Sequence, residues 1–410
     1  MFDHSSIIVG LEIGTSKICA AVGEMNADGA LSIIGLGQSP SRGVRKGEIV
    51  DAAVAEECVR NAIVEAEHMA DAEIRSVYLG VTGGHIRGFN NHGVHPVVSA
   101  DREITEDDVQ DVIKNARAIN LPPDNHVVHA IRQHFTVDGR DGVTNPEGML
   151  GARLEVDVHV VHGNFNRLQN AIRAVKALQL EVDDVVFNGL ATSLAAFSNV
   201  QKELGALVID LGAGTTDYAV VVDGVTTHTG VLAVGGDHVT NDIAVGLKIP
   251  QRLAEQLKIE HGFAIVDEAV AGQTLTIPNE YGLQPRVINL EHLRRIMHAR
   301  LDEIFELIWR DLDQHDMLEH LRAGVFISGG GARIPQITRL AAETFQMPIT
   351  LARTSTINGL QSSLDQPEFI TAIGLVKFGS LRQKRTARSS LGLGGLRDSI
   401  TNLFRTRRFN

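Results

Sequence analysis

The sequence predicts an α/β fold with two lobes, a small inserted α+β subdomain and a C-terminal amphipathic helix. Three observations lead to this prediction. One short pattern occurs twice, nearly half the chain apart; a glycine-rich turn follows a later strand; and the last residues combine basic charge with an apolar helical stripe. A chain of 410 residues exceeds one ordinary hydrophobic core, so we expect two or more domains.

The repeated pattern consists of an apolar strand, an acid, a turn of glycine and hydroxyl residues, and a second apolar strand. It occupies residues 8–17 (Ile-Val-Gly-Leu-Glu-Ile-Gly-Thr-Ser-Lys) and 207–217 (Leu-Val-Ile-Asp-Leu-Gly-Ala-Gly-Thr-Thr-Asp). The order is typical of a β-hairpin whose turn binds a phosphate, because glycines let backbone N–H groups approach the anion and hydroxyls add donors. Two such hairpins facing each other would hold a nucleoside triphosphate between the lobes.

Each copy supplies candidate ligands for a phosphate and its metal. We expect the acids Glu12 and Asp210 to meet at one Mg²⁺, mostly through water, while Asp217 braces its hairpin. Lys17 can pair with a β- or γ-phosphate, although a tight turn with an exposed lysine explains the first copy equally well when it is taken alone. The turn residues expected at the phosphates are Gly14, Thr15, Ser16, Gly212, Ala213, Gly214, Thr215 and Thr216.

A third candidate element is the run Gly329-Gly330-Gly331-Ala332, between a predicted strand at 324–328 and a predicted helix. Without side chains at Gly330 and Gly331, a ring or ribose can lie against the backbone there, beside Ala332 and the helix N-terminus. A sharp strand-to-helix turn is the alternative for this motif alone. It is neither GxGxxG nor a loop ending in GK[ST], which disfavours dinucleotide and Walker-type binding.

The alternation of strand and helix patterns suggests how the chain divides. We assign residues 1–83, 163–203 and 367–380 to the first lobe, and 204–237 with 302–366 to the core of the second. Residues 238–301 form a small subdomain of the second lobe. Residues 84–162 break the pattern and predict the inserted module, with a helix that begins at the capping box of Thr105 and Asp108. Residues 381–395, rich in Arg, Ser and Gly, predict a flexible linker.

The C-terminal segment 396–410 predicts a helix lying on an anionic membrane surface. The net charge of the chain is −12, yet residues 382–410 hold eight basic residues and one acid; their excess of +7 leaves −19 on the rest. Apolar residues recur at spacings of three and four, and arginines flank them. The residues assigned to the membrane are Leu396, Arg397, Ile400, Leu403, Phe404, Arg405, Arg407 and Arg408.

Two other interpretations of this segment are a core helix and a nucleic-acid-binding arm. The predicted linker argues against the core helix, and the lack of interleaved stacking aromatics argues against nucleic acid. No apolar run reaches the length of a membrane span and no secretory signal is visible, so we expect a cytoplasmic protein. The histidine pairs His126/His129 and His159/His162 lack supporting acids or cysteines and are expected to be structural.

The order of two phosphate hairpins and a glycine-rich turn resembles the superfamily of actin, heat-shock chaperone and hexokinase ATPases. More closely, five features resemble the bacterial cell-division FtsA family: the segment Val-Gly-Leu-Glu-Ile-Gly-Thr-Ser-Lys, the 84–162 insert, Val234-Gly-Gly-Asp-His-Val-Thr-Asn-Asp-Ile, Glu255-Gln-Leu-Lys-Ile-Glu-His-Gly, and the basic tail. The resemblance implies an actin-like fold that binds ATP and Mg²⁺. It implies that Gly235 and Gly236 lie near phosphate or ribose, and Glu255 and Lys258 near ribose and base.

The same resemblance implies a role and partners. The protein would polymerise on the cytoplasmic face of the inner membrane at the division site, anchor the ring of the tubulin-like protein FtsZ and recruit other divisome proteins. Residues 238–301 would bind the FtsZ C-terminal peptide. A pilus-assembly scaffold and a small-molecule kinase of the superfamily are the alternatives; a chaperone is disfavoured, since no substrate-binding domain follows.

One position departs from the superfamily pattern. Where related ATPases carry a Gln or Glu that orients the attacking water, this chain has Asn188, followed by Gly189. Asn is shorter than Gln by one methylene, and a misplacement of about 1 Å can cost roughly two orders of magnitude in rate. We therefore expect ATP binding with weak or slow hydrolysis, and Asn188 is the candidate for positioning water.

Overall fold

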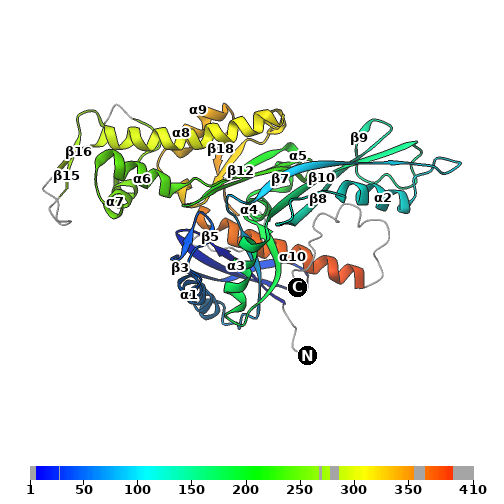
Figure 1. Ribbon diagram of the computed structural model, residues 1–410, viewed down its shortest axis with the longest axis horizontal. Coiled ribbons are helices and arrows are strands. Elements are labelled where there is room, and N and C mark those ends of the chain that lie inside the picture. Colours follow the sequence, from blue (N-terminus) through cyan, green and yellow to red (C-terminus); the bar gives the residue numbers. More distant parts are fainter. Residues whose placement is uncertain (1–5, 27, 267–269, 278–285, 355–364, 391–410) are drawn as a thin grey trace.

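The computed structural model describes residues 6–26, 28–266, 270–277, 286–354 and 365–390. It has two lobes built around separate five-stranded sheets, and an inserted module projects from one end of the molecule (Figure 1). The amphipathic segment 396–410 and residues 391–395 of the predicted linker lie outside the described residues. Within the described ranges, no helix has the length and apolar character needed to cross a bilayer.

The sheet of the first lobe has the order β11-β6-β1-β2-β3. The predicted hairpin is the antiparallel pair β1–β2, and β1 also runs parallel to β6, so that Glu12 lies opposite Gly80. Most residues of the central strands β1, β2 and β6 are apolar and buried, as expected for a sheet covered by helices. Their bounds are Ser6–Ile13 (β1), Lys17–Met25 (β2), Leu31–Pro40 (β3), Ser76–Val81 (β6) and Glu181–Phe187 (β11).

The sheet of the second lobe repeats this arrangement with the order β18-β17-β12-β13-β14. The second hairpin, β12–β13, stands where β1–β2 stands in the first sheet, and Asp210 lies opposite Ser328 of the parallel neighbour β17. The repeated sequence pattern therefore corresponds to a repeated topology. The strands are Ala206–Leu211 (β12), Thr216–Val222 (β13), Val225–Leu232 (β14), Val325–Ser328 (β17) and Ile349–Leu351 (β18).

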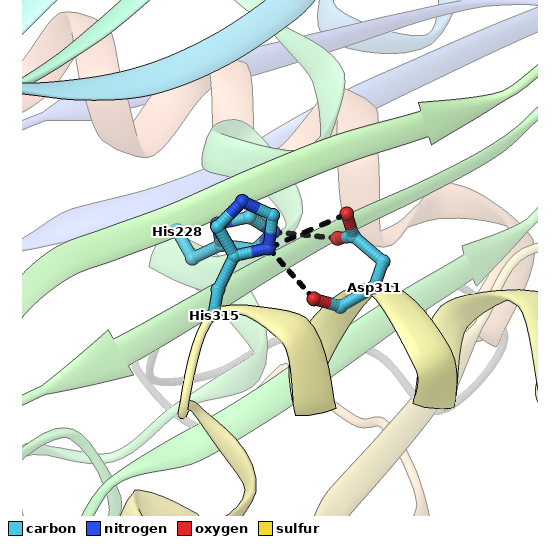
Figure 2. A group of neighbouring side chains, drawn as sticks. All are labelled: His228, Asp311 and His315. Atoms are coloured by element: carbon cyan, nitrogen blue, oxygen red, sulfur yellow. Dashed lines mark hydrogen bonds and ion pairs between the residues drawn. The ribbon is translucent and has the colours of Figure 1, made fainter.

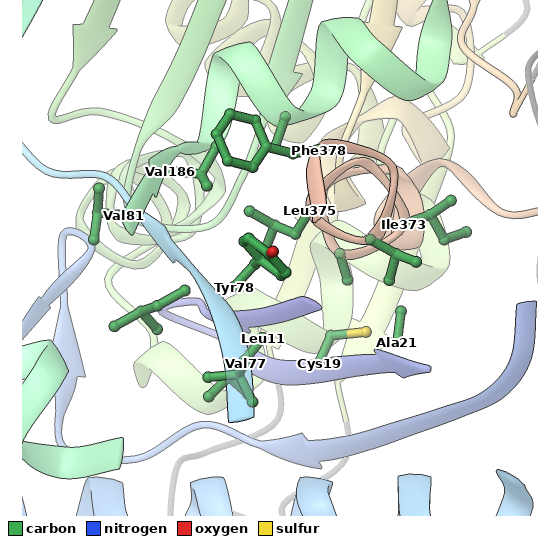
Figure 3. Close-up of a cluster of buried hydrophobic side chains, with 14 of the residues drawn as sticks. Leu11, Cys19, Ala21, Val77, Tyr78, Val81, Val186, Ile373, Leu375 and Phe378 are labelled. Carbon is green, nitrogen blue, oxygen red and sulfur yellow. The ribbon is translucent and has the colours of Figure 1, made fainter. Parts of the chain in front are cut away.

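Helices α4 (Asn188–Ala196) and α10 (Ile370–Ser390) pack between the two sheets. Figure 3 shows α10 resting on the first-lobe strands, with Leu375 and Phe378 directed toward Tyr78. The helices approach closely because Gly374 has no side chain: a Cβ there would collide with the carbonyl of Ala191. One continuous apolar core thus joins the first sheet, both helices and one face of the second sheet.

Helices α1 and α3 lie on the other face of the first sheet, the short pair β4–β5 lies beside α3, and α5 packs on β13 of the second sheet. Helix α1 begins at Ala52, where the Asp51 carboxylate accepts a hydrogen bond from the Val54 amide, and it ends at Ala70. Helix α5 follows α4 after a short break. The bounds are Ala52–Ala70 (α1), Phe165–Lys176 (α3), Asn199–Leu204 (α5), Val44–Arg45 (β4) and Glu48–Ile49 (β5).

The outer part of the second lobe is mainly helical. The long helix α8 packs on α6 and α9, and together with the second sheet they share one apolar core. A two-stranded sheet, β15–β16, lies at the far end of the lobe (Figure 1). The bounds are Gly236–Leu247 (α6), Gln251–His261 (α7), Leu290–Gln314 (α8), Ile337–Phe345 (α9), Thr274–Ile277 (β15) and Arg286–Asn289 (β16).

The inserted module has its own apolar core and a four-stranded sheet, order β7-β10-β8-β9, covered by α2. The predicted capping box is confirmed: Thr105 and Asp108 bond reciprocally at the start of α2. The module contacts the second lobe through β14, where His159 hydrogen-bonds to Thr229. Its elements are Arg87–Pro96 (β7), Glu106–Arg117 (α2), Asn125–Val137 (β8), Arg140–Val143 (β9) and Arg153–Asn164 (β10).

The predicted flexible linker needs a correction at its start. Residues 381–390 continue α10 without interruption, so the helix runs ten residues past the predicted boundary. The local cause is visible at Arg382, whose guanidinium forms an ion pair of 2.6 Å with Asp184 and lies over the Phe378 ring. A basic residue that sequence composition assigned to a linker is instead held by a nearly buried acid of β11.

Candidate functional site

A cleft of about 400 Å³ lies between the lobes, where both hairpin turns converge. Its volume is in the range of small-molecule sites. Both lobes, the glycine-rich turn after β17 and helix α7 contribute to its wall. The lining includes Glu12, Gly14, Thr15, Ser16, Lys17, Asn188, Asp210, Gly212, Ala213, Gly214, Thr215, Gly236, Glu255, Lys258, Gly330 and Gly331.

The two turns close in the same way. The Gly14 N–H donates to the Lys17 carbonyl at 3.1 Å, and the Gly212 N–H donates to the Thr215 carbonyl at 3.0 Å. Each closing bond uses the first amide of its turn and so does not use the amides at the tip. Backbone donors at the tips of two facing turns provide an anion-binding concavity.

The turns also touch each other across the cleft. A Cβ on Gly214 would collide with Thr15 Oγ1 and would lie 2.8 Å from Lys46 Cα. On the other side of the same contact, Thr15 Oγ1 accepts a hydrogen bond of 3.0 Å from the Gly47 amide. Glycine at position 214 is therefore what lets the second turn approach the first lobe.

Three carboxylates face this junction: Asp210 and Asp217 are buried, and Glu12 is partly buried. Asp210 accepts a hydrogen bond of 2.6 Å from Thr371, and Asp217 accepts bonds of 2.5 Å from Thr82 and 3.1 Å from Thr215. Glu12 differs, because its Oε2 is buried and has no hydrogen-bond partner. The brace role predicted for Asp217 agrees with its two threonine contacts, one of which crosses between lobes.

Burial makes these acids hard to ionise. It raises the pKa of Glu12 to about 7, with Lys17 opposing the shift and Asp210 adding to it. Burial also raises the pKa of Asp210, and it raises that of Asp217 well above its ordinary value. Positive charge placed in this cavity would therefore favour the ionised form of all three groups.

Lys17 is the cation whose charge acts on both Glu12 and Asp210. Its Nζ donates to the backbone carbonyl of Glu368 and lies 5.0 Å from the centre of the Phe369 ring. Burial lowers the pKa of Lys17, but the neighbouring charges of Glu12, Cys19, Asp210 and Glu368 outweigh it and raise the pKa above its ordinary value. The lysine is thus held, charged, beside Glu12, and it is not the exposed side chain of an ordinary turn.

Helices α6 and α7 contribute the second lobe's part of the cleft wall. The Lys258 ammonium is 2.7 Å from Glu255 Oε2, donates to Thr240 Oγ1 at 2.8 Å and to the Gly236 carbonyl at 3.2 Å. These contacts fix a lysine and an acid beside the N-terminus of α6. The pair presents both a donor and an acceptor to the cavity.

The glycine-rich turn departs from its predicted geometry. Residues Gly330–Arg333 form a short 3-10 turn (η4), and helix α9 begins only at Ile337, so no helix N-terminus follows the glycines directly. Gly329 adopts φ 82°, which side chains disfavour, and a Cβ there would also collide with Asp210 Oδ1. A Cβ on Gly330 would meet no atom within 4 Å, so this backbone faces open space in the cleft.

Asn188 lies at the first position of α4 and contributes to the cleft wall. Its side chain is buried, and its Oδ1 has no hydrogen-bond partner. A buried amide oxygen without a partner needs a donor, such as water. The position therefore suits a group that would hold a water molecule.

Three predicted residues do not line the cleft. Thr216 is buried and donates to the Val234 carbonyl at 2.8 Å, and Ala332 is buried in the core of the second lobe. Gly235 lies behind the wall, where a Cβ would meet the carbonyls of Gly212 and Ala213. The hairpin pattern specifies the turn, whereas the direction of each side chain depends on how the strand packs.

Sequence reasoning missed several wall residues from segments distant in the chain. Glu368 and Arg333 form an ion pair across the cleft mouth, with 2.5 Å between Nη2 and Oε1. Arg333 directly follows the glycine-rich run, but its pairing with Glu368 joins residues 35 positions apart, which no sequence pattern indicated. The additional wall residues are Thr82, Asp217, Asp237, Ile259, Gly329, Arg333, Ile334, Pro335 and Glu368.

The donor set fits a Mg-nucleotide. The unpartnered Glu12 Oε2 and the raised pKa values of Glu12 and Asp210 indicate carboxylates that lack a cation, and hard oxygen ligands are those that Mg²⁺ prefers. The turn backbones and Lys17 supply donors for phosphate oxygens. The open backbone at Gly330 leaves room for a flat group.

Comparison with solved structures defines the class of protein as the actin-like fold. A chain of the "PilM-PilN type IV pilus biogenesis complex" aligns with a TM-score of 0.63, at 16% sequence identity, covering 91% of this chain and 98% of that chain. MreB5 of Spiroplasma citri, solved bound to ADP, aligns with a TM-score of 0.56 at 17% identity, covering 95% and 99%. Identities this low support the fold alone.

Sequence comparison identifies the family. The family model described as "Cell division protein FtsA" matches residues 207–374, and the model described as "SHS2 domain inserted in FTSA" matches residues 83–162. The chain is 38% identical over 389 residues to FtsA of Pseudomonas aeruginosa, covering 95% of this chain and 92% of that protein. It is 35% identical over 380 residues to FtsA of Escherichia coli K12, covering 91% and 90%. The chain belongs to the FtsA family of cell division proteins.

Proposed function

We propose that this protein binds ATP with Mg²⁺ in the interlobe cleft and polymerises on the cytoplasmic membrane, where it anchors the FtsZ ring and recruits other division proteins. The observation that carries the proposal is the convergence of two glycine turns, a held lysine and a carboxylate with no partner at one cavity. Family membership supports the role in division.

The ligand contacts are proposed residue by residue. The tips of the turns around Thr15 and Gly214 bind phosphate oxygens, and Lys17 pairs with the terminal phosphates. Glu12 and Asp210 hold Mg²⁺, partly through water; bound Mg²⁺ supplies positive charge to the phosphates. The Glu255–Lys258 pair binds the ribose and base, with Gly330 and Gly331 against the ring.

Hydrolysis is proposed to be slow. Asn188 is the residue that would hold the attacking water. Because its side chain is short, it would hold this water too far from the terminal phosphate. Replacing Asn188 with Gln should raise the rate of phosphate release by at least about tenfold, since the added methylene carries the amide into the cleft. An unchanged rate in the intact chain on vesicles would contradict this assignment.

Membrane attachment is proposed to depend on polymerisation. A few partly inserted apolar side chains, with about 1 kcal/mol for each arginine near an anionic leaflet, give reversible attachment to a single molecule. A filament multiplies this affinity through effective concentration. The inserted module and the β15–β16 end, which lie at opposite ends of the long axis in Figure 1, are suitable for contacts between successive subunits.

The proposal is tested by sedimentation with anionic vesicles, with and without ATP-Mg²⁺ and with and without residues 396–410. We expect ATP-dependent binding that is lost on removing the segment. Ile400→Glu, on the apolar stripe, should abolish sedimentation, whereas the matched control Thr401→Glu, on the polar side, should preserve it. Binding that depends on neither ATP nor the segment would overturn the proposal.

The partner is tested separately. Exposed apolar side chains at Val245 of α6 and Val287 of β16 support a docking surface in the small subdomain, at 69% and 66% exposure. Val245→Asp should weaken binding of an FtsZ C-terminal peptide, and the control Val200→Asp, an exposed valine of α5, should not. Failure of the intact protein to retain FtsZ would favour a pilus-type scaffold, and phosphoryl transfer to a sugar would favour a kinase.

A further inference from the structure

A group of metal-ligating side chains lies outside the cleft, where the end of α8 meets β14. His228 comes from β14, Asp311 comes from the last turn of α8, and His315 is the C-cap residue that follows this helix. One imidazole nitrogen from each histidine and a carboxylate oxygen lie within 4.8 Å of one another. Figure 2 shows the three side chains converging on one point.

We propose that His228, Asp311 and His315 bind one divalent transition-metal ion of the zinc class. Two imidazoles and one carboxylate are ligands that such ions prefer, and Mg²⁺ does not favour nitrogen donors. Three protein ligands leave a fourth tetrahedral position for water. This surface has no role in the proposed nucleotide site.

The distances require little rearrangement. His228 Nε2 is 2.6 Å from Asp311 Oδ2, and His315 Nδ1 is 3.6 Å from Asp311 Oδ1. Ligand atoms around tetrahedral zinc stand about 3.3 Å apart, given bonds of about 2.0–2.1 Å. An ion that replaces the shared hydrogen therefore moves His228 and Asp311 apart by less than about 1 Å.

The surroundings of the group resemble those of a metal centre. Tyr218 donates a hydrogen bond of 2.7 Å to Asp311 Oδ2, which orients the carboxylate from behind.

Exposure permits an ion to enter from one side. The His228 side chain is 7% exposed, whereas Asp311 is 30% and His315 is 52% exposed. His315 Nδ1 presently donates a hydrogen bond of 2.7 Å to the Asp311 carbonyl. Being half exposed, its ring can turn to present a nitrogen to the ion without displacing core residues.

A bound ion would tie α8 to the strand on which the inserted module rests. Both neighbours of His228 contact that module: Asn90 donates to the Thr227 carbonyl at 3.1 Å, and His159 bonds to Thr229 Oγ1 at 2.8 Å. The ion would therefore stabilise the junction between the second lobe and the insert.

The test is zinc titration of the full, tag-free chain against a chromophoric chelator. We expect one equivalent bound by the native chain, a loss of at least roughly tenfold in affinity for His315→Ala, and a similar loss for Asp311→Asn. His292→Ala, an exposed histidine at the other end of α8, is the matched control and should bind zinc normally.

A second measurement separates ligation from structural damage. Zinc should raise the unfolding midpoint of the native chain and of His292→Ala by about 3 °C, and should not raise that of His315→Ala. Equal zinc affinity in the native chain and His315→Ala would overturn the proposal, and so would weak binding without a stoichiometry of one. Mg²⁺ should produce no comparable shift.

Discussion

The hairpins β1–β2 and β12–β13 occupy the same position in two sheets of the same strand order, yet their acids have different partners. Asp210 is held by Thr371 of α10, whereas Glu12 retains an oxygen with no partner. The first turn is followed by a charged lysine, and the second by the braced Asp217. The difference shows that the protein itself supplies a partner to the acid of the second hairpin, whereas it leaves one oxygen of the first hairpin's acid without one.

The largest expected effect concerns Glu12. An acid whose folded pKa is about 7, above an ordinary 4.5, is destabilising once ionised, so stability of the ligand-free protein falls as pH rises from 4.5 through 7. The cost at pH 8 is about 3 kcal/mol. Glu12→Gln should remove this fall in denaturant unfolding and should weaken Mg-nucleotide binding. Glu57→Gln, an exposed acid of α1, is the control; an unchanged pH profile in Glu12→Gln would contradict the comparison.

The contact between turns is tested by Gly214→Val. A side chain at 214 collides with the first turn, so nucleotide affinity should fall at least about 100-fold, equivalent to about 2.7 kcal/mol. The measurement is titration with a fluorescent ATP analogue. Gly330→Val is the variant for comparison. A Cβ at position 330 meets no protein atom within 4 Å, so the unfolding temperature of this variant should equal that of the native chain. Normal affinity in Gly214→Val would show that the turns need not touch.

Lys17→Ala tests the difference in charge between the two hairpins, since the first turn is followed by a lysine and the second by an acid. Losing a cation beside the terminal phosphates should reduce nucleotide affinity about tenfold, equivalent to about 1.4 kcal/mol. The same titration measures it, with the exposed Lys176→Ala of α3 as control. If both variants bind nucleotide equally, Lys17 serves only to hold Glu368 and Phe369 in place.

The smallest effect is expected for Thr371→Val. Asp210 would lose one hydrogen bond, which costs about 1 kcal/mol in unfolding free energy and brings its environment closer to that of Glu12. Thr276→Val, an exposed threonine of β15, is the matched control in denaturant unfolding. Equal stability of the two variants would mean that α10 does not support Asp210.

Sequence reasoning succeeded where local pattern governs the structure. The two hairpins and the capped helix α2 follow from residue spacing and capping chemistry. It failed where a distant residue decides the outcome. The ion pair of Arg382 with Asp184 extends α10 into the predicted linker, and no composition rule contains that contact.

The candidate cleft shows the same division. The turn residues Gly14 and Gly212 were identified from their motif, because a phosphate-binding turn needs glycine at fixed positions. Thr216 and Ala332 were assigned to the site although they face the interior. Arg333 and Glu368 were missed because their pairing depends on how η4 meets the segment before α10.

By itself, the sequence determined the repeated hairpins, the strand and helix order, the family and the basic amphipathic tail, since each depends on the spacing of residues close together in the chain. Only the tertiary structure decided which side chains share a cavity. It left Glu12 without a partner, gave one to Asp210, and brought His228 to Asp311 and His315 from 83 residues away. Burial and pairing depend on the three-dimensional neighbours of a group, and these are set by packing rather than by spacing.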